Sequence, residues 1–171
     1  MPVSQITEVF NERLGARYGV RLKGGGAEPF YQAPKAPECA LIVFRADYSA
    51  SALHEVAHWC LAGRQRRLLD DYGYWYLPAR NAAQQAAFEA VEARPQALEA
   101  LFAEAAGVDF QVSSDDVASL PSPAFKARVA AERRLIEQQL PVRARCFLAA
   151  LKGANALIAP TAARTASVTA S

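Results

Sequence analysis

The sequence predicts a single α+β domain that is mostly helical, has a small β-sheet and is zincin-like around a metal-binding helix. Three observations predict this class. Apolar residues recur at helical spacing along most of the 171-residue chain. Residues 39–44 form a short, continuously apolar run rich in branched and aromatic side chains, which is typical of a buried strand. His54 and His58, the only two histidines, stand four residues apart, and Glu55 directly follows the first.

The N-terminal part predicts one helix and a few extended segments. Residues 4–18 have a helical apolar period, with Ser4 as the N-cap and Gly19 as the stop. Residues 20–22 predict a short strand, and the glycine run at 24–26 predicts a loop after it. An extended segment at Phe30 and Tyr31 and the clear strand at 39–44 follow.

The helix that carries both histidines comes next. Ser49 or Ser51 is its expected N-cap, and Gly63 ends it soon after Leu61. Side chains at i and i+4 lie one turn apart on the same face, so both imidazoles can reach a single ion. Neutral imidazoles suit zinc, iron, copper or nickel. Glu55 lies one residue round the helix, which places its carboxylate beside the metal rather than on it.

The second half predicts further helices. Asn81 caps one that runs to about Arg94, where Pro95 either kinks the helix or begins a new one that stops at Gly107. Residues 108–112 predict a short strand.

Two helices, at residues 122–139 and from Pro141 onwards, complete the expected fold. Phe125, Val129, Ala130 and Ile136 are expected on the core side of the first of these. Beyond Gly153 the chain turns to alanine, threonine and serine. The domain is therefore expected to span residues 1–153, and residues 154–171 to be a disordered tail.

Composition excludes several classes of protein. With 52% apolar and 21% charged residues, the chain has the composition of a globular domain with its own core. The formal net charge of +2 is too small to indicate direct binding of nucleic acid. No apolar run reaches membrane-spanning length and no secretion signal is seen, so we expect a cytoplasmic protein without a membrane partner. The three cysteines form no C-x-x-C pair, which favours reduced thiols.

A third metal ligand is needed, because two histidines leave a divalent ion under-coordinated and a functional site also keeps an open position. The extended zinc-protease pattern has a glycine and a histidine three and six residues after its second histidine, where this chain has Leu61 and Arg64. That subclass is therefore excluded. With no third histidine in the chain, the third ligand must be a carboxylate or a thiolate.

Two glutamates on the helix after Asn81 are the best candidates for this ligand. The apolar face of that helix is defined by Phe88, Val91, Leu98 and Phe102. Glu92 lies about 80° from the centre of the face, whereas Glu89 lies about 140° away. We therefore favour Glu92, with Glu89 as the alternative.

The same ligands fit two chemistries. With Zn²⁺, Glu55 would act as general base on a bound water, as in a metallopeptidase. With Fe(II), His54, His58 and Glu92 would form a 2-His-1-carboxylate site with open positions for oxygen. A non-enzymatic alternative is a metal-stabilised binding module that closes the fourth position with a protein ligand. The ligand set alone leaves these alternatives open.

Three blocks of sequence resemble the elongation factor P hydroxylase family, whose members hydroxylate the modified lysine of bacterial translation elongation factor P. They are residues 48–63 (Tyr-Ser-Ala-Ser-Ala-Leu-His-Glu-Val-Ala-His-Trp-Cys-Leu-Ala-Gly), 72–76 (Tyr-Gly-Tyr-Trp-Tyr) and 88–98 (Phe-Glu-Ala-Val-Glu-Ala-Arg-Pro-Gln-Ala-Leu). The resemblance covers most of the chain to about residue 150. It implies a metal-dependent protein hydroxylase that is not a jelly roll.

The resemblance also implies the roles of individual residues. Its metal ligands correspond to His54, His58 and Glu92, and we expect one divalent ion, Fe(II), which zinc can replace. Glu55 would act beside the metal, orienting a ligand or moving a proton. Whether 2-oxoglutarate takes part is left open, as is the source of electrons.

The implied partner is elongation factor P, which carries a long, cationic, lysine-derived side chain. Carboxylates and aromatic walls suit such a chain, and the candidates are Asp70, Asp71, Tyr74 and Trp75. Elongation factor P is acidic, so a basic rim near the metal helix would attract it electrostatically. The candidates for this rim are Arg45, Arg64, Arg66 and Arg67.

Overall fold

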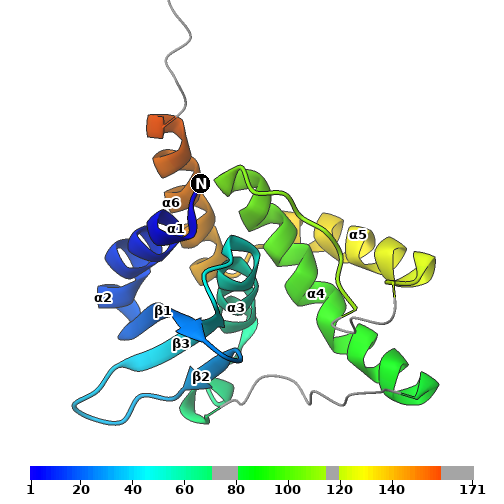
Figure 1. Cartoon of the computed structure of the whole chain (residues 1–171), viewed down its shortest axis with the longest axis horizontal. Helices are drawn as coiled ribbons and strands as arrows, with labels where there is room; N and C mark the ends of the chain where they lie inside the picture. Colours follow the sequence, from blue (N-terminus) through cyan, green and yellow to red (C-terminus); the bar gives the residue numbers. More distant parts are fainter. Residues whose placement is uncertain (71–80, 115–119, 159–171) are drawn as a thin grey trace, which may run out of the picture.

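A three-stranded sheet and a layer of helices surround one central helix, α3 (Figure 1). The computed structural model describes residues 1–70, 81–114 and 120–158. The elements are, in chain order, α1 (Val3–Phe10), the π-helical turn η1 (Asn11–Gly15), α2 (Ala16–Tyr18), β1 (Val20–Gly26), β2 (Phe30–Gln32), β3 (Ala40–Arg45), α3 (Ser49–Leu61), the 3-10 turn η2 (Arg66–Leu68), α4 (Ala82–Ala106), α5 (Pro123–Gln138) and α6 (Val142–Ile158). The expected class, a mostly helical α+β domain with a small sheet, is confirmed.

The sheet has the order β1-β3-β2, with β1 parallel and β2 antiparallel to the central strand β3. The glycine run does not form the expected loop, because β1 includes it. A Cβ atom at Gly24 would lie 2.7 Å from the Phe44 ring, and one at Gly26 would lie 2.6 Å from Val43. The glycines therefore allow the end of β1 to approach β3 closely.

The predicted N-terminal helix is present as α1, η1 and α2, which end at Gly19. Its N-cap position is Pro2 rather than Ser4, and the N–H groups of Gln5 and Ile6 donate to the Pro2 carbonyl. The side chain of Asn11 accepts a hydrogen bond from the N–H of Leu22 (2.8 Å) and donates one to its carbonyl (3.0 Å). These two bonds attach the π-helical turn to β1.

Helix α3 follows β3 after a short turn and packs on both β3 and α4. Neither Ser49 nor Ser51 caps it, because the N-cap position is Tyr48. The Ser51 hydroxyl instead accepts a hydrogen bond from the backbone N–H of Arg45 at 3.0 Å. The predicted capping serine therefore ties the start of α3 to the end of β3.

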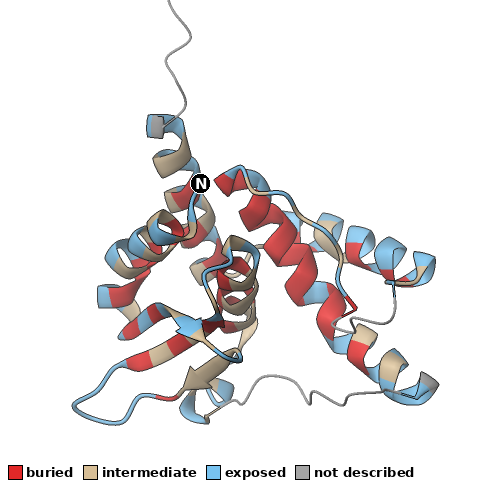
Figure 2. Cartoon of the chain, in the orientation of Figure 1, coloured by how far each residue is buried: buried red, intermediate tan, exposed pale blue. Residues whose placement is uncertain are grey.

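Helix α4 runs without interruption through Pro95, so no new helix begins there. Asn81 caps it as predicted. The Asn81 side chain accepts a hydrogen bond from the N–H of Gln84, and the Gln84 side chain accepts one from the N–H of Asn81, both at 2.9 Å. The helix ends at Gly107, whose φ of +63° favours glycine. Figure 2 shows that the buried residues of α4 are concentrated in its second half.

Residues 108–112, which were expected to form a strand, have no regular secondary structure. The Gln96 side chain bonds the backbone of Ser113 twice, accepting from its N–H at 3.0 Å and donating to its carbonyl at 2.8 Å. A buried side chain on α4 thus supplies the hydrogen bonds that a neighbouring strand would otherwise provide.

The last two helices differ from expectation in detail. Helix α5 begins where a helix was predicted, and the Ser122 side chain caps it by accepting a hydrogen bond from the N–H of Phe125. Phe125, Val129 and Ile136 are buried as expected, but Ala130 is exposed. Helix α6 continues through Gly153 to Ile158, so the prediction of disorder is wrong for residues 154–158.

Packing explains the extension of α6. The side chain of Asn155 lies against Gly107 at the end of α4, and Asn155 and Ala156 line a cavity shared with α4. Residues 159–171 lie outside the described part.

The hydrophobic core joins α1, α3, α4 and α6 to one face of the sheet. Phe147 on α6 packs edge-on against Phe102 on α4 and Phe10 on α1, with ring centroids 5.0 and 5.5 Å apart. This packing holds α1, α4 and α6 together. Helix α4 also packs directly on α3, and that contact decides the geometry of the site described next. Among the described residues, no helix is both long enough and apolar enough to cross a membrane.

Candidate metal centre

Two neighbouring helices bring together His54, His58 and Glu92. The histidines lie one turn apart on α3, and their Nε2 atoms are 3.0 Å apart. Glu92 on α4 places Oε2 3.6 Å from Nε2 of His54 and Oε1 3.5 Å from Nε2 of His58. One ligand atom from each residue lies within 4.8 Å of the others. Within the part of the chain that the structure describes, these three side chains form the cluster of potential ligands that could hold a metal ion.

The spacing of the two Nε2 atoms, 3.0 Å, suits a shared ion, and the Glu92 oxygens at 3.5 and 3.6 Å lie slightly beyond the ideal range. Two ligand atoms that are each about 2.1 Å from one ion, at an angle of 90–110°, lie about 3.0–3.4 Å apart. The carboxylate of Glu92 is fully buried, with 0% of its side chain exposed, and the imidazoles are partly buried. A buried carboxylate stays ionised only beside a compensating cation, and a divalent ion held by both histidines supplies one.

Glu99 is a further site residue that the sequence reasoning missed. Its Oε2 lies 2.8 Å from Nδ1 of His54. When Nδ1 of His54 carries a proton and donates it to Glu99, the lone pair on Nε2 is directed toward His58 and Glu92. Carboxylates that accept from the second nitrogen of a metal-binding histidine hold its tautomer and raise its basicity.

The spacing along α4 could have identified Glu99. Glu92, Gln96 and Glu99 stand at i, i+4 and i+7, and all three are buried. These positions lie on one face of a helix, so a buried polar stripe accompanies the apolar residues. The apolar face assumed from the sequence was wrong in one respect, because Val91 is 59% exposed. Because Glu92, Gln96 and Glu99 are all buried, the buried face of α4 extends past its apolar residues, and Glu92 lies within that face rather than on its flank.

The carboxylates around His54 change its protonation. Burial opposes the charged form, but the charges of Glu99, Glu55 and Glu92 together outweigh this and raise the pKa of His54 to about 10. In the metal-free protein this negative field attracts either a proton or a metal ion to the imidazole. The two cations therefore compete for His54.

Metal uptake by the metal-free protein is expected to release a proton, because His54 must be deprotonated to bind through Nε2. The apparent metal affinity should rise with pH by up to about tenfold per unit until the pKa of about 10 is reached. Titration calorimetry in buffers of different ionisation enthalpy measures the proton release. An affinity that stays constant from about pH 7 to 9 would contradict this competition.

The other two glutamates considered from the sequence lie outside the cluster of three. Glu55, on α3, is half-buried, and its charge acts on His54. Glu89 accepts a hydrogen bond from Gln85 at 3.2 Å along α4 and is not one of the three clustered residues. The cluster therefore favours Glu92 over Glu89 as the third ligand.

Of the four proposed substrate-binding residues, the structure describes only Asp70, which is not one of the clustered residues. Asp70 accepts a hydrogen bond from the N–H of Ala33 at 2.7 Å and forms an ion pair with Lys35 at 3.0 Å. Both interactions lower the pKa of Asp70, the Ala33 bond most. Its carboxylate thus holds the segment that follows β2. The other three predicted residues, Asp71, Tyr74 and Trp75, lie outside the described residues.

The basic rim is only partly as predicted. Arg45, Arg64 and Arg66 are exposed, and Arg67 is half-buried. Arg67 donates to the carbonyl of Ala62, so it also serves the end of α3. The contact of these residues with a partner stays a prediction.

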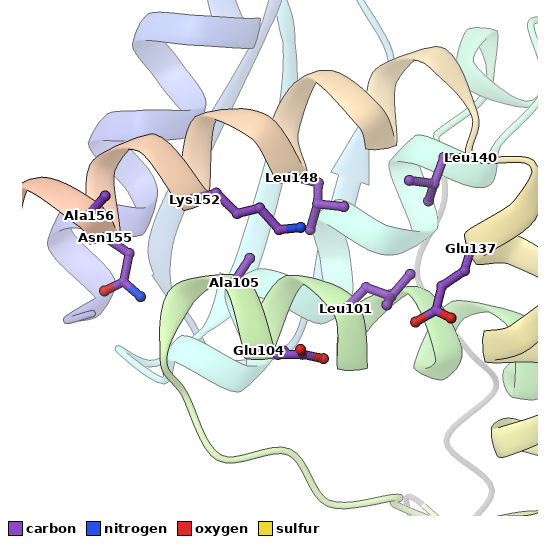
Figure 3. A pocket seen from close by; sticks show the side chains of 9 residues that line it. All are labelled: Leu101, Glu104, Ala105, Glu137, Leu140, Leu148, Lys152, Asn155 and Ala156. Atoms are coloured by element: carbon purple, nitrogen blue, oxygen red, sulfur yellow. The ribbon is translucent and has the colours of Figure 1, made fainter.

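A cavity of about 600 Å³ lies away from the metal cluster, between α4 and α6 near the end of α5 (Figure 3). Its walls combine leucines and alanines with Glu104, Glu137 and Lys152. Glu104 and Glu137 both pair with Arg133. None of the three clustered residues His54, His58 and Glu92 lines the cavity, so its size does not make it the candidate centre.

Comparison with known proteins finds a matching family and a similar relative. A family model described as elongation factor P hydroxylase matches residues 9–162. The chain is 41% identical over 155 residues to the elongation factor P lysine hydroxylase of Haemophilus influenzae, an alignment that covers 87% of this chain and 86% of that protein. Both matches include the helices that carry the two histidines, Glu92 and Glu99.

Proposed function

Because the chain belongs to the elongation factor P hydroxylase family, we propose that it hydroxylates the modified lysine of translation elongation factor P at the centre formed by His54, His58 and Glu92. The observation that carries this proposal is the convergence of two imidazoles and a buried carboxylate from two helices. A relative that shares most of the chain is named for the same substrate and reaction. We also infer that the protein acts in the cytoplasm, where its proposed substrate works.

Iron is the metal that this chemistry favours. Two histidines and one carboxylate on one side of an ion leave open positions, as in non-haem Fe(II) oxygenases. When bound, Fe(II) would supply the oxidising chemistry, whereas zinc binds similar ligands but has no redox chemistry. His54, His58 and Glu92 would hold the ion, and Glu99 would keep His54 in the tautomer that presents Nε2.

Glu55 is proposed to act beside the metal rather than on it. It follows His54 on α3, is half-buried, and helps to raise the pKa of that histidine. A carboxylate in this place can orient a ligand or carry a proton to or from the reacting group. A zincin-like arrangement around α3 is part of the proposal, supported by the His-Glu-x-x-His motif and by the entry of α3 from the central strand β3.

A zinc peptidase is the second candidate, and the His-Glu-x-x-His motif is the observation that favours it. In that case Glu55 would be the general base on a metal-bound water, and replacing it would abolish cleavage. The two functions differ in the metal required and in the product formed. One experiment can therefore distinguish them.

Protein purified without added metal is expected to contain iron and, once iron-loaded, to add one oxygen atom to elongation factor P. Metal analysis and intact-mass spectrometry of the substrate measure the two results. Zinc-loaded protein is the matched control and should leave the substrate mass unchanged, because zinc has no redox chemistry. Cleavage of the substrate by zinc-loaded protein, lost in Glu55→Gln, would instead support the peptidase.

A further inference from the structure

A depression of about 480 Å³ at the C-terminal end of α3 is lined by four arginines. Arg64 and Arg67 come from the segment after α3, Arg94 from α4 and Arg143 from α6. Its lining, as far as the structure describes it, contains no aspartate or glutamate. We call these four residues the arginine pocket. Four guanidinium groups from three parts of the chain therefore converge without an acidic residue between them.

Two of these arginines are held rigidly. A single nitrogen of Arg143, Nη2, lies 3.0 Å from the carbonyls of Trp59 and Cys60 and 2.6 Å from that of Ala62. Its guanidinium also lies over the Trp59 ring, 4.8 Å from the centroid. Arg67 donates to the same Ala62 carbonyl. Because carbonyls are neutral acceptors, these bonds fix the positions of both guanidinium groups without cancelling their charge.

The positive charges in the pocket act on one another. Burial and then the charge of Arg67 lower the pKa of Arg143. Arg64 and Arg94 are exposed, and within the described ranges neither forms an ion pair with a carboxylate. An oxyanion bound in the pocket would relieve the repulsion and accept bidentate hydrogen bonds from guanidinium groups.

The pocket lies next to the metal centre. Leu61, which also lines it, follows His58 by three residues, a separation of about 4.5 Å along the axis of α3. Arg94 follows Glu92 by two residues on α4. The side chain of Arg94 is exposed, whereas that of Glu92 is buried. A macromolecule whose reacting side chain enters the metal centre can therefore also place a second side chain in the pocket.

We propose that the arginine pocket binds a carboxylate side chain of the protein substrate and so holds the substrate with its modified lysine at the metal. This inference rests on the proposed function. A protein substrate carries aspartates and glutamates on its surface, and the pocket is open enough to receive one from outside. Rigid guanidinium groups lose little side-chain freedom on binding, so the site favours one orientation of the partner over diffuse attraction.

The double substitution Arg64→Gln with Arg94→Gln tests this proposal. Both side chains are exposed and make no ion pair within the described structure, so the substitution removes charge without removing a hydrogen bond that holds α3. The Kd of the iron-loaded enzyme for elongation factor P should rise by about 5- to 30-fold, and its salt dependence should become weaker. The kcat at saturating substrate and the iron content should not change.

Matched controls separate the pocket from general charge. Arg128→Gln with Arg134→Gln makes the same change in net charge on exposed positions of α5, and its Kd should match that of the unsubstituted enzyme. Arg94→Glu should weaken binding more than Arg94→Gln, because it introduces repulsion. Inorganic phosphate should compete with elongation factor P for the unsubstituted enzyme and compete less for the double variant.

Three outcomes would overturn the proposal. They are an unchanged Kd in the pocket variant, an equal loss of affinity in the α5 control, and loss of phosphate binding without loss of affinity for elongation factor P. The last would identify a site for a free anion. Failure of the proposed function looks different, because the enzyme would then bind elongation factor P through the arginine pocket without adding oxygen to it.

Discussion

Glu92→Ala is expected to lower the affinity for iron by more than about 100-fold and to abolish oxygen addition to elongation factor P. Loss of a carboxylate that only supports a ligand typically costs 10- to 100-fold, and loss of a ligand should cost more. The Glu92 carboxylate is fully buried and lies 3.5 and 3.6 Å from the two Nε2 atoms. With alanine in its place, the two histidines alone would hold the ion. Titration of metal-free protein with Fe(II) under anaerobic conditions measures the loss.

Glu89→Ala is the matched control for this prediction. Glu89 lies on the same helix, bonds Gln85 and is not one of the three clustered residues, so its replacement should leave iron affinity unchanged. Circular dichroism would check that both variants keep their helices. If Glu92→Ala retained iron while Glu89→Ala lost it, the assignment of the third ligand would be wrong.

Glu99→Ala is expected to reduce iron affinity and kcat/KM by about 10- to 100-fold. Glu99 reaches Nδ1 of His54 at 2.8 Å and is the largest single cause that raises the pKa of that histidine. Without its carboxylate, His54 loses the partner that selects the metal-binding tautomer, and its pKa falls. Proton release on metal binding should therefore decrease together with the affinity.

A conservative variant distinguishes positioning of the ring from a general structural role. Glu99→Gln keeps an oxygen that can accept from Nδ1, so it should recover part of the iron affinity that alanine loses. It lacks the negative charge, so the pKa of His54 should be lower in both variants than in the unsubstituted enzyme. Glu104→Ala, an exposed position on the same helix, should match the unsubstituted enzyme. Unchanged affinity and proton release in Glu99→Ala would contradict the role of Glu99.

The candidate metal centre could be predicted only in part from the sequence. His54 and His58 need only a local helix to share a face, so their spacing was enough to place both imidazoles side by side. Glu92 was inferred from the phase of an apolar face and from a resemblance, and the structure brings it to both histidines. The apolar face used for this inference included Val91, which is exposed, so Glu92 was favoured from a face that was partly wrong.

Glu99 shows where such reasoning fails. Helical phase places it on the same side as Glu92, but phase does not tell whether a glutamate faces another helix or solvent. Only the packing of α4 against α3 buries it beside His54. The four arginines are a similar case, because they come from three segments distant in sequence and converge only where the end of α3, α4 and α6 meet.

The sequence by itself determined the class of the fold, the histidine helix, the strand before it, the cap at Asn81, the start of a helix at Ser122 and Pro123, and the helix ends at Gly19 and Gly107. These features depend on interactions between residues a few positions apart, whose energies do not need the rest of the chain. The tertiary structure decided the rest. The glycine run extends β1 because β3 lies beside it, and Gly26 pairs with Arg45 of that strand. The backbone at Ser113 bonds Gln96 instead of a strand. Glu92 and Glu99 reach one imidazole because α4 packs against α3. Such contacts join residues far apart in sequence and leave no local signal in it.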